Sequence, residues 1–377
     1  MRLFMLYVCT CIFMFCSCEN MPDSREIQTF DFGENDYAIS ASILQDKGMI
    51  IGGSTNSIRD NRDMLVMRID ENNQKVWVKS IGGKTTDRCF NVIELDDHSF
   101  IAVGSIQVSS GNLDMLVLRL SKTGEIIWSR NFGGRYNEDG RAVVQADDGS
   151  VIVVGTTASF GAGSNDVFLV KITKEGQLFW QRTFGNTSID VGNDIKKLEN
   201  GDFIIAGYSS NGIYPFHTLL IRVSSEGDEL WKKIYTMGVS SDGRSVSILP
   251  DGGYIVSGNV RLSPYSGAIS TMILRTDADG NVMWHNSFLG STETNHGIIL
   301  KDNIYAVAGQ ITTRQTNAFV MTVDAISGAQ IDFKMYGTSG YSSANAILKK
   351  GSDFFVVGWI ETDRIKKIDV FIEKINF

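Results

Sequence analysis

One pattern occurs seven times along the chain and limits what it can fold into. A short aliphatic run that ends in glycine recurs at steps of 51, 51, 52, 51, 51 and 49 residues. The glycines are Gly53, Gly104, Gly155, Gly207, Gly258, Gly309 and Gly358. This regular spacing over most of the 377 residues predicts a repeat array, in which each unit buries apolar surface against the next.

Each repeat has the pattern of four short strands. In the third repeat, runs rich in Val, Ile, Phe and Trp occupy residues 141–145, 150–154, 167–172 and 177–183. Turn signals such as Asp148-Gly149 separate them. No stretch of ten or more residues shows the 3.6-residue apolar period of a helix. Four antiparallel strands in about 50 residues are typical of one blade of a β-propeller.

The two ends of the chain predict how the ring closes. The seventh repeat supplies strands near 344–348, 354–358 and 369–376, which is one strand short of a blade. Residues 27–33 resemble 331–337, with Phe32-Gly33 in the place of Phe132-Gly133. We therefore expect the segment 26–33 to pair with 369–376 and to close an all-β, seven-bladed propeller over residues 26–377.

A tryptophan recurs in these repeats as Gly-x-x-x-Trp. Trp128, Trp180, Trp231 and Trp284 each lie four residues after a glycine. This string resembles the tryptophan-docking repeat of quinoprotein-type (PQQ-like) propellers, and the whole unit is similar to repeats of secreted proteins and lipoproteins of Bacteroidetes and archaea. The resemblance covers residues 26–377 and implies the fold. It does not carry over the dehydrogenase activity of quinoproteins, because the adjacent cysteine pair expected there is missing and Cys89 stands alone.

The N-terminal segment has the pattern of an export signal. Arg2 precedes an apolar run of about 13 residues, shorter than the roughly 20 that a membrane-spanning helix needs. Ser17-Cys18 after this run resembles the lipobox of bacterial lipoproteins, although Phe15 stands where the pattern prefers Leu. We expect residues 1–17 to be the signal peptide, Cys18 to carry the lipid, and residues 18–25 to form a tether. An ordinary cleaved signal is the alternative.

The net charge and the cysteine content limit the possible partners and the cellular location. The net charge of −8 argues against a nucleic-acid partner. Four of the five cysteines lie within residues 1–18, before the domain, so no disulfide is available within the domain. We expect a monomer at the cell envelope, held at the outer membrane through Cys18 on its periplasmic or surface face.

Acidic residues recur just before the first strand of five repeats. They are Asp36, Asp87, Asp139, Asp190 and Asp242, with Asn295 and Ser343 in the last two repeats. One interpretation, which we favour, is that each carboxylate caps the backbone of its own turn. The other is that the five form a ring at the channel mouth that binds a cation or a basic ligand.

Basic residues recur on the third strand. They are Arg68, Arg119, Lys171, Arg222, Arg275 and Lys374. We expect Val117 to face Trp128 across the hairpin and Arg119 to lie diagonally over the indole, a structural cation–π contact.

The sequence contains no recognisable catalytic motif. The four histidines fall in different repeats without metal-ligand spacing, and we predict neither a metal site nor a cofactor. Aromatic residues in or beside loops are candidates for stacking on a sugar or a partner, or are ordinary surface aromatics. They are Phe160, Tyr208, Tyr214, Phe216 and Tyr265.

These observations favour a lipid-anchored binding or scaffolding module for a protein or glycan partner. The alternative is a polysaccharide-degrading enzyme of the glycoside hydrolase type that uses two loop carboxylates, about 5 to 5.5 Å apart in a retaining mechanism. A close carboxylate pair in a deep channel pocket would favour the enzyme.

Overall fold

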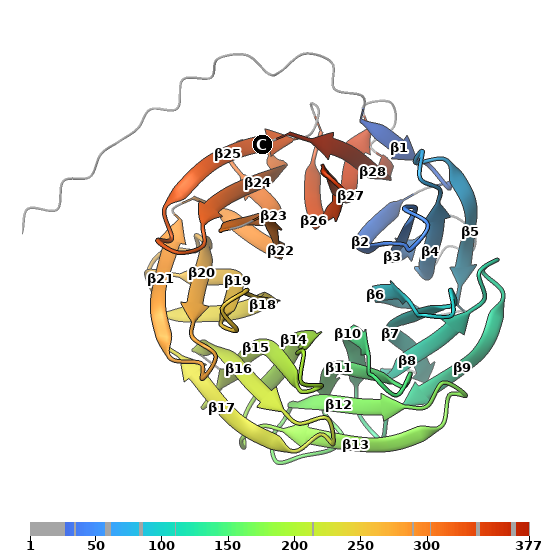
Figure 1. Cartoon of the computed structure of the whole chain (residues 1–377), viewed down its shortest axis with the longest axis horizontal. Helices are drawn as coiled ribbons and strands as arrows, with labels where there is room; N and C mark the ends of the chain where they lie inside the picture. The colour runs from blue at the N-terminus through green and yellow to red at the C-terminus, as the bar shows by residue number, and fades with distance from the viewer. Residues whose placement is uncertain are drawn as a thin grey trace, which may run out of the picture.

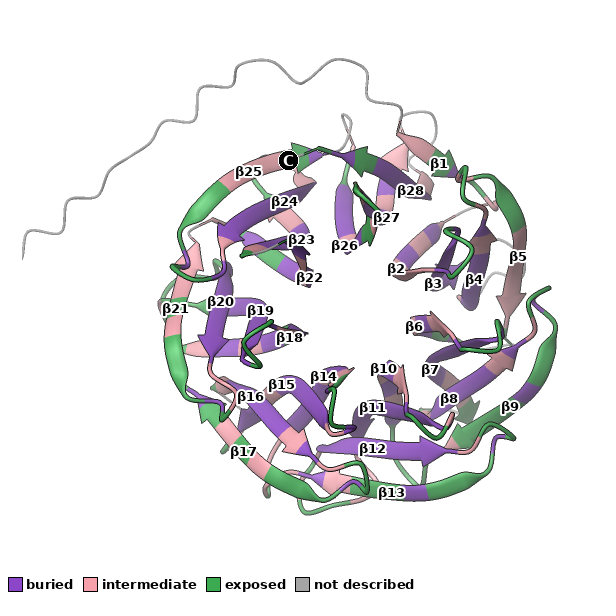
Figure 2. Ribbon diagram, viewed as in Figure 1, coloured by how far each residue is buried: buried purple, intermediate pink, exposed green. Residues whose placement is uncertain are grey.

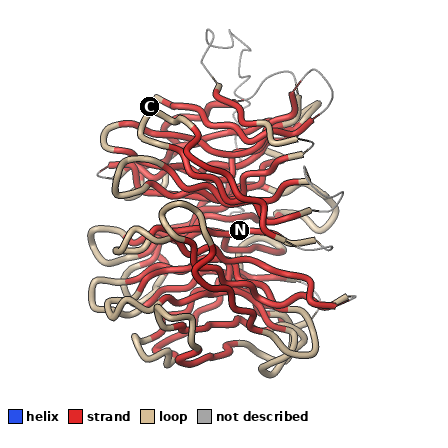
Figure 3. Tube along the Cα trace, turned by 90° about the vertical axis from the view of Figure 1, so that its right-hand side faces the viewer, coloured by secondary structure: helices blue, strands red, loops and turns tan. Residues whose placement is uncertain are grey.

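The chain forms a closed ring of seven four-stranded antiparallel sheets in a computed structural model (Figure 1). The structure describes residues 27–33, 35–56, 62–82, 86–109, 111–212, 215–288, 290–301, 303–336, 340–362 and 367–376. These residues are strands joined by loops at the two faces of the ring (Figure 3), and they include no helix that could cross a membrane. The predicted seven-bladed β-propeller is confirmed. Cys18 and the signal segment lie outside the described residues.

The blades follow one another along the chain, and the first strand of each lies nearest the axis (Figure 1). Blades one to three are β2 (Asp36–Ile43), β3 (Met49–Thr55), β4 (Asp63–Ile69) and β5 (Lys75–Ile81); β6 (Arg88–Glu94), β7 (Phe100–Ser109), β8 (Asn112–Leu120) and β9 (Ile126–Phe132); and β10 (Glu138–Gln145), β11 (Val151–Thr157), β12 (Asp166–Ile172) and β13 (Leu178–Phe184). Blades four to six are β14 (Asp190–Lys197), β15 (Phe203–Ser210), β16 (Phe216–Val223) and β17 (Glu229–Tyr235); β18 (Ser240–Ile248), β19 (Tyr254–Arg261), β20 (Ser270–Thr276) and β21 (Val282–Phe288); and β22 (Thr292–Lys301), β23 (Ile304–Thr312), β24 (Thr316–Asp324) and β25 (Gln330–Tyr336). Blade seven is β26 (Ser342–Lys350), β27 (Asp353–Thr362), β28 (Lys367–Ile375) and β1 (Gln28–Phe30).

The two middle strands of a blade are buried on both faces, whereas the outermost strand consists mostly of exposed and half-buried residues (Figure 2). β11 and β12, for example, are buried along their whole length. Such strands contain continuous aliphatic runs because each face packs on a different neighbouring blade. One core cluster joins blades three and four through side chains such as Val154, Leu169 and Ile205. The hydrophobic core therefore lies between blades.

The repeated glycine of the second strand is required by a bulge in the first strand. The pairing of β10 with β11 shifts between Gly140 and Ala142, opposite Gly155. A Cβ atom on Gly155 would lie 1.9 Å from the carbonyl oxygen of Asp139, so no side chain fits. The same close approach occurs at the repeated glycine of every blade.

The N-terminal strand closes the ring, as predicted. β1 pairs with β28, with Gln28 opposite Ile372 and Phe30 opposite Val370. The expected register was wrong by two residues, because Phe30 takes the place assigned to Phe32. Phe30 is buried in the core between blades seven and one, whereas Phe32 is only partly buried. Residues two apart share one face of a strand, so the apolar pattern fits both registers.

The tryptophans dock on the following blade. The Trp128 indole N–H donates to the carbonyl oxygen of Lys174 at 3.0 Å, and its ring covers Gly176. Trp77, Trp180, Trp231 and Trp284 cover Gly124, Gly227, Gly280 and Gly328 in the same way. Each docked glycine has a positive φ, which is 83° at Gly176. The Gly-x-x-x-Trp string thus joins successive blades around the ring.

The basic residues of the third strand do not lie over the tryptophans as expected. Arg119 is directly opposite Trp128 in the register, and it forms an ion pair with Asp97. The cation over the Trp128 ring is Arg130, with its guanidinium carbon 5.9 Å from the ring centroid. A bulge between Arg119 and Leu120 shifts the pairing that a regular hairpin would have, so Val117 faces Arg130 instead.

We predict that Gly176→Ala lowers stability more than Gly149→Ala. Both glycines have positive φ, 83° and 77°, and both variants carry the roughly 1–2 kcal/mol cost of a left-handed alanine. Only at residue 176 would the new Cβ lie 2.8 Å from the Trp128 ring, whereas no atom lies within 4 Å at residue 149. Overpacking adds about 1–3 kcal/mol, which urea unfolding can measure. Equal losses in the two variants would contradict tryptophan docking.

Candidate functional site at the central channel

The ring encloses a cavity of about 980 Å³ along its axis. Each first strand contributes one unpaired bulge residue to the cavity wall. The seven residues are Ile39, Phe90, Arg141, Asn193, Arg244, Asn295 and Asn345. Sequence reasoning missed them, although each lies 14 residues before the repeated glycine, or 13 in the last blade. The bulge that requires the glycine therefore also presents one side chain per blade to the channel.

Hydrogen bonds to neighbouring blades fix several of these side chains. Asn295 donates to the Oδ1 atom of Asn345 at 2.7 Å, and Asn345 donates to the carbonyl oxygen of Ala38 at 2.6 Å. On the other side of the channel, Arg141 donates to Asn193 at 2.7 Å. The polar lining is thus held in place before any ligand binds.

Three arginines reach the cavity wall and differ in their partners. Arg141 donates twice to Asp139, at 3.0 Å each, and Arg244 donates once to Asp242 at 3.2 Å. Burial acts to lower the pKa of Arg141, but the charge and hydrogen bonds of Asp139, together with Tyr208, outweigh it and raise the pKa, so this group stays charged. Arg88 is exposed, and among the described residues no hydrogen bond or ion pair engages its guanidinium.

The five aspartates expected to form a ring occupy two different positions. Asp36, Asp87 and Asp190 are buried where the first strand begins, while Asp139 and Asp242 come one residue later and line or border the channel. Glu138 is the true counterpart of Asp36 in blade three, because both lie 17 residues before the repeated glycine. Successive residues of a strand point to opposite faces, so a one-residue shift separates the two groups. The ring of five carboxylates is therefore wrong.

The turn-capping interpretation holds at the buried position. Asp36 accepts the backbone N–H of Phe32 at 2.8 Å, and Asp190 accepts that of Asn186 at 2.8 Å. In blade three the cap is Glu138, which accepts the N–H of Gly134 at 2.8 Å. Asp139 instead orients Arg141, as described above.

Of the candidate aromatics, Tyr208 lines the channel. Burial raises its pKa, so the hydroxyl stays protonated at neutral pH, and its ring centroid lies 4.9 Å from that of Phe216. Phe160 packs on Phe168 in the core, and Tyr265 is 98% exposed on a loop. Tyr214 lies outside the described residues.

His296 is a half-buried histidine in the channel wall. Its Nδ1 atom accepts the backbone N–H of Ile347 at 3.3 Å. Burial, with a smaller effect of the Lys196 charge, lowers the pKa of His296 to about 4. The imidazole is therefore neutral at pH 7 and adds no positive charge to the site.

Comparisons with known proteins agree on the fold. No family model matches the chain, and no curated protein matches it by sequence. The solved structures it resembles include a polysaccharide lyase of family PL25, an ulvan lyase with a bound -[GlcA(1-4)Rha3S]- saccharide (TM-score 0.63, 11% identity, 92% of this chain and 96% of that one). They also include the Neurospora crassa Pan2 WD40 domain (0.56, 11%, 91% and 90%) and YCF48 bound to a D1 peptide (0.55, 11%, 94% and 99%). At this identity the likeness concerns the fold alone.

We predict that His296 lowers the stability of the protein in acid. Its pKa is about 4 in the folded state and near 6.5 when unfolded, so the unfolded chain binds more protons between these values. Stability should therefore fall as the pH drops from 6.5 to 4, by about 3 kcal/mol at most. Melting curves of His296→Gln should show a weaker pH dependence, whereas His285→Gln, exposed on the outer strand β21, should behave as wild type. Identical pH profiles for wild type and His296→Gln would refute this assignment.

Proposed function

We propose that this protein is a cell-envelope binding module that takes an acidic glycan at its central channel. The observation that carries the proposal is Arg88, an exposed guanidinium in the cavity wall without a partner among the described residues. Arg244 shares the same cavity, and only its Nε atom is engaged by Asp242. Guanidinium groups bind carboxylates and sulfates through paired, charge-assisted hydrogen bonds.

The remaining lining suits a sugar better than an apolar ligand. Amides and hydroxyls such as Asn91, Asn345 and Tyr208 can exchange hydrogen bonds with sugar hydroxyls, and the Phe90 and Tyr208 rings are available for stacking. The cavity volume of about 980 Å³ is at the upper end of small-ligand pockets, which run from roughly 300 to 1,000 Å³. The ulvan lyase of similar fold, solved with a glucuronate-containing saccharide, gives further support.

The carboxylates favour binding over hydrolysis. In the channel, Asp139 and Asp242 are each engaged by the arginine two residues further along the strand. The acids Asp166 and Asp190 lie between blades, where both side chains are 1% exposed and out of reach of a sugar. Two more acids are in the cavity wall. Glu138 is 1% exposed and accepts the backbone N–H of Gly134, and Asp194 is 8% exposed and pairs with Lys196. A glycoside hydrolase needs both carboxyl groups at the scissile bond.

We also propose that acylated Cys18 anchors the ring. The apolar run before Ser17-Cys18 supports this, as does its length, which is too short to span a bilayer. β1, which follows the tether, is the outermost strand of blade seven (Figure 1). The lipid would therefore hold the propeller by its rim and leave the channel mouth accessible.

Replacing Arg88 should weaken glycan binding. Binding to an array of uronic-acid and sulfated oligosaccharides would identify a ligand, and calorimetry with that ligand would then compare variants. We expect Arg88→Gln to reduce affinity roughly tenfold through loss of a charge-assisted hydrogen bond. Arg182→Gln, which removes the same charge from the outer strand β13, should bind as wild type. Preference for neutral glycans, or equal affinity of the two variants, would count against the proposal.

Replacing Cys18 should release the protein from the membrane. A clickable fatty acid fed to cells should label the wild type, and Cys18→Ala should remain unlabelled and appear in the soluble fraction. Cys16→Ala, which leaves Ser17-Cys18 intact, should still be labelled. Labelling that persists in Cys18→Ala would show that the lipid is carried elsewhere.

A further inference from the structure

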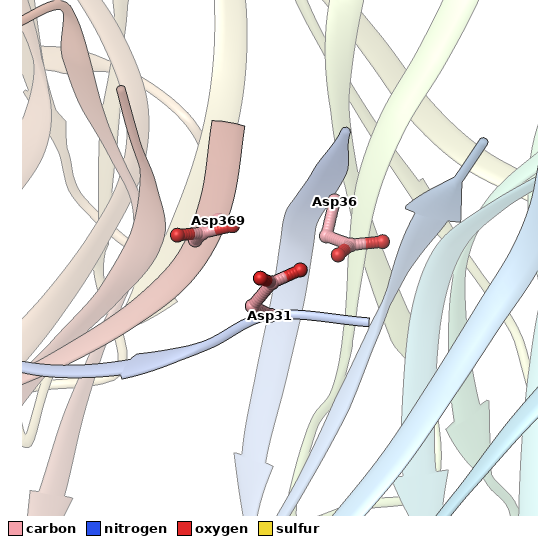
Figure 4. A group of neighbouring side chains, drawn as sticks. All are labelled: Asp31, Asp36 and Asp369. Atoms are coloured by element: carbon pink, nitrogen blue, oxygen red, sulfur yellow. The ribbon is translucent and has the colours of Figure 1, made fainter. Parts of the chain in front are cut away.

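Three carboxylates meet where the ring closes. Asp31, Asp36 and Asp369 can each place one oxygen within 4.8 Å of the others (Figure 4). They come from three segments: Asp31 follows β1, Asp36 opens β2, and Asp369 lies in β28. The cluster therefore joins the N-terminal strand, the last strand and the first blade.

Two of these acids belong to a repeated arrangement. At three other contacts between blades, an acid near the start of the third strand lies close to the acid that precedes or opens the first strand of the next blade. The pairs are Asp63 with Asp87, Asp114 with Glu138, and Asp166 with Asp190. A glycine covers each pair: a Cβ atom on Gly133 would lie 2.3 Å from Asp114 Oδ1 and 2.7 Å from Glu138 Oε2. The corresponding distances are 2.4 and 2.7 Å at Gly82, and 1.9 and 3.1 Å at Gly185.

Asp31 occupies the position that these glycines hold elsewhere. Phe132, just before Gly133, is opposite Met115, which directly follows the junction acid Asp114. Phe30, just before Asp31, is likewise opposite Val370, which directly follows Asp369. The closing junction thus has a third carboxylate in the position where the other three junctions have a glycine. This difference is specific to the closure among the four acidic junctions.

The two buried acids of the cluster have partners for only part of their oxygens. Asp36 accepts the backbone N–H of Phe32 at 2.8 Å and a side-chain hydrogen bond from Thr55. Asp369 Oδ2 accepts a hydrogen bond from the hydroxyl of Thr362 at 3.2 Å. Asp36 is fully buried and Asp369 is 5% exposed. Asp36 Oδ1 and Asp369 Oδ1 make no hydrogen bond within the described part of the chain. The Lys367 ammonium lies 3.9 Å from a carboxylate oxygen of the outer acid Asp31. Burial first, and the charges of neighbouring acids in addition, raise the pKa values of Asp36 and Asp369. Buried oxygens without donors are costly unless a ligand engages them.

We propose that Asp31, Asp36 and Asp369 bind one divalent cation, with Ca²⁺ the best match, and that this ion locks the ring closed. Ca²⁺ prefers carboxylate oxygens at roughly 2.3–2.6 Å, so oxygens up to about 5 Å apart can share it. Water and backbone carbonyls would complete its six to eight ligands. Sequence reasoning did not bring these three acids together, because Asp31 and Asp36 lie near the N-terminus and Asp369 near the C-terminus.

The test uses the whole protein, freed of metal with a chelator and then supplied with CaCl₂. Equilibrium dialysis with radioactive calcium should give one ion per chain, and the Tm should rise by roughly 2–4 °C in millimolar Ca²⁺. Asp31→Gly, which restores the residue of the other junctions, should fold, bind no calcium and lose the Tm response. Asp31→Asn serves as a second variant. Asp114→Asn, at a junction without a third acid, should keep the response.

Three results would overturn the proposal. The first is a wild-type protein that binds no calcium and shows no Tm change. The second is a calcium response that survives in Asp31→Gly. The third is a Tm that rises in acid without responding to calcium, which would show that the acids share a proton instead. None of these measurements involves a glycan, so they are independent of the proposed function.

Discussion

Packing of one blade face against the next is the interaction on which the whole ring depends. The middle strands carry apolar side chains on both faces, and core clusters combine residues of adjacent blades. A single blade would leave two apolar faces in water, so no blade is expected to be stable alone. The one described cysteine, Cys89, is a buried free thiol, so no disulfide within the described domain supplements this packing. The contact between blades seven and one, which closes the ring, is therefore as necessary for stability as the other contacts between blades.

The bulge in the first strand serves structure and site together. It brings the first strand so close to the second that only glycine fits there, which accounts for the repeated glycine. The same bulge turns one side chain per blade into the channel. That residue lies outside the apolar clusters between blades, so it can vary from Ile39 to Arg141 to Asn345 while the core stays the same. Arg141, Asn295 and Asn345 hydrogen-bond to the neighbouring blade instead.

Symmetry is broken where the chain closes on itself. Three junctions between blades hold an acid pair beneath a glycine, but the closing junction has Asp31 in the glycine position. At this junction the N-terminal strand β1, which has three residues, pairs with β28 and completes blade seven. A bound cation there would add ionic contacts at the place where covalent continuity is missing.

The sequence by itself determined the blades, their number and the closing strand, because those features follow from a periodic pattern of apolar residues and turns. Whatever depends on a shift of one or two residues was decided by the tertiary structure. Phe30 and Phe32 share one strand face, so the sequence pattern fits either of them at the core position. In the structure Phe30 is the buried one. Asp139 and Asp36 differ by one place in the repeat, which sends one towards the channel and the other between blades. The position of each bulge residue depends on how the backbones of two strands pair. The contact between Asp31 and Asp369 depends on pairing between the two ends of the chain. Neither can be predicted from a local pattern of side chains.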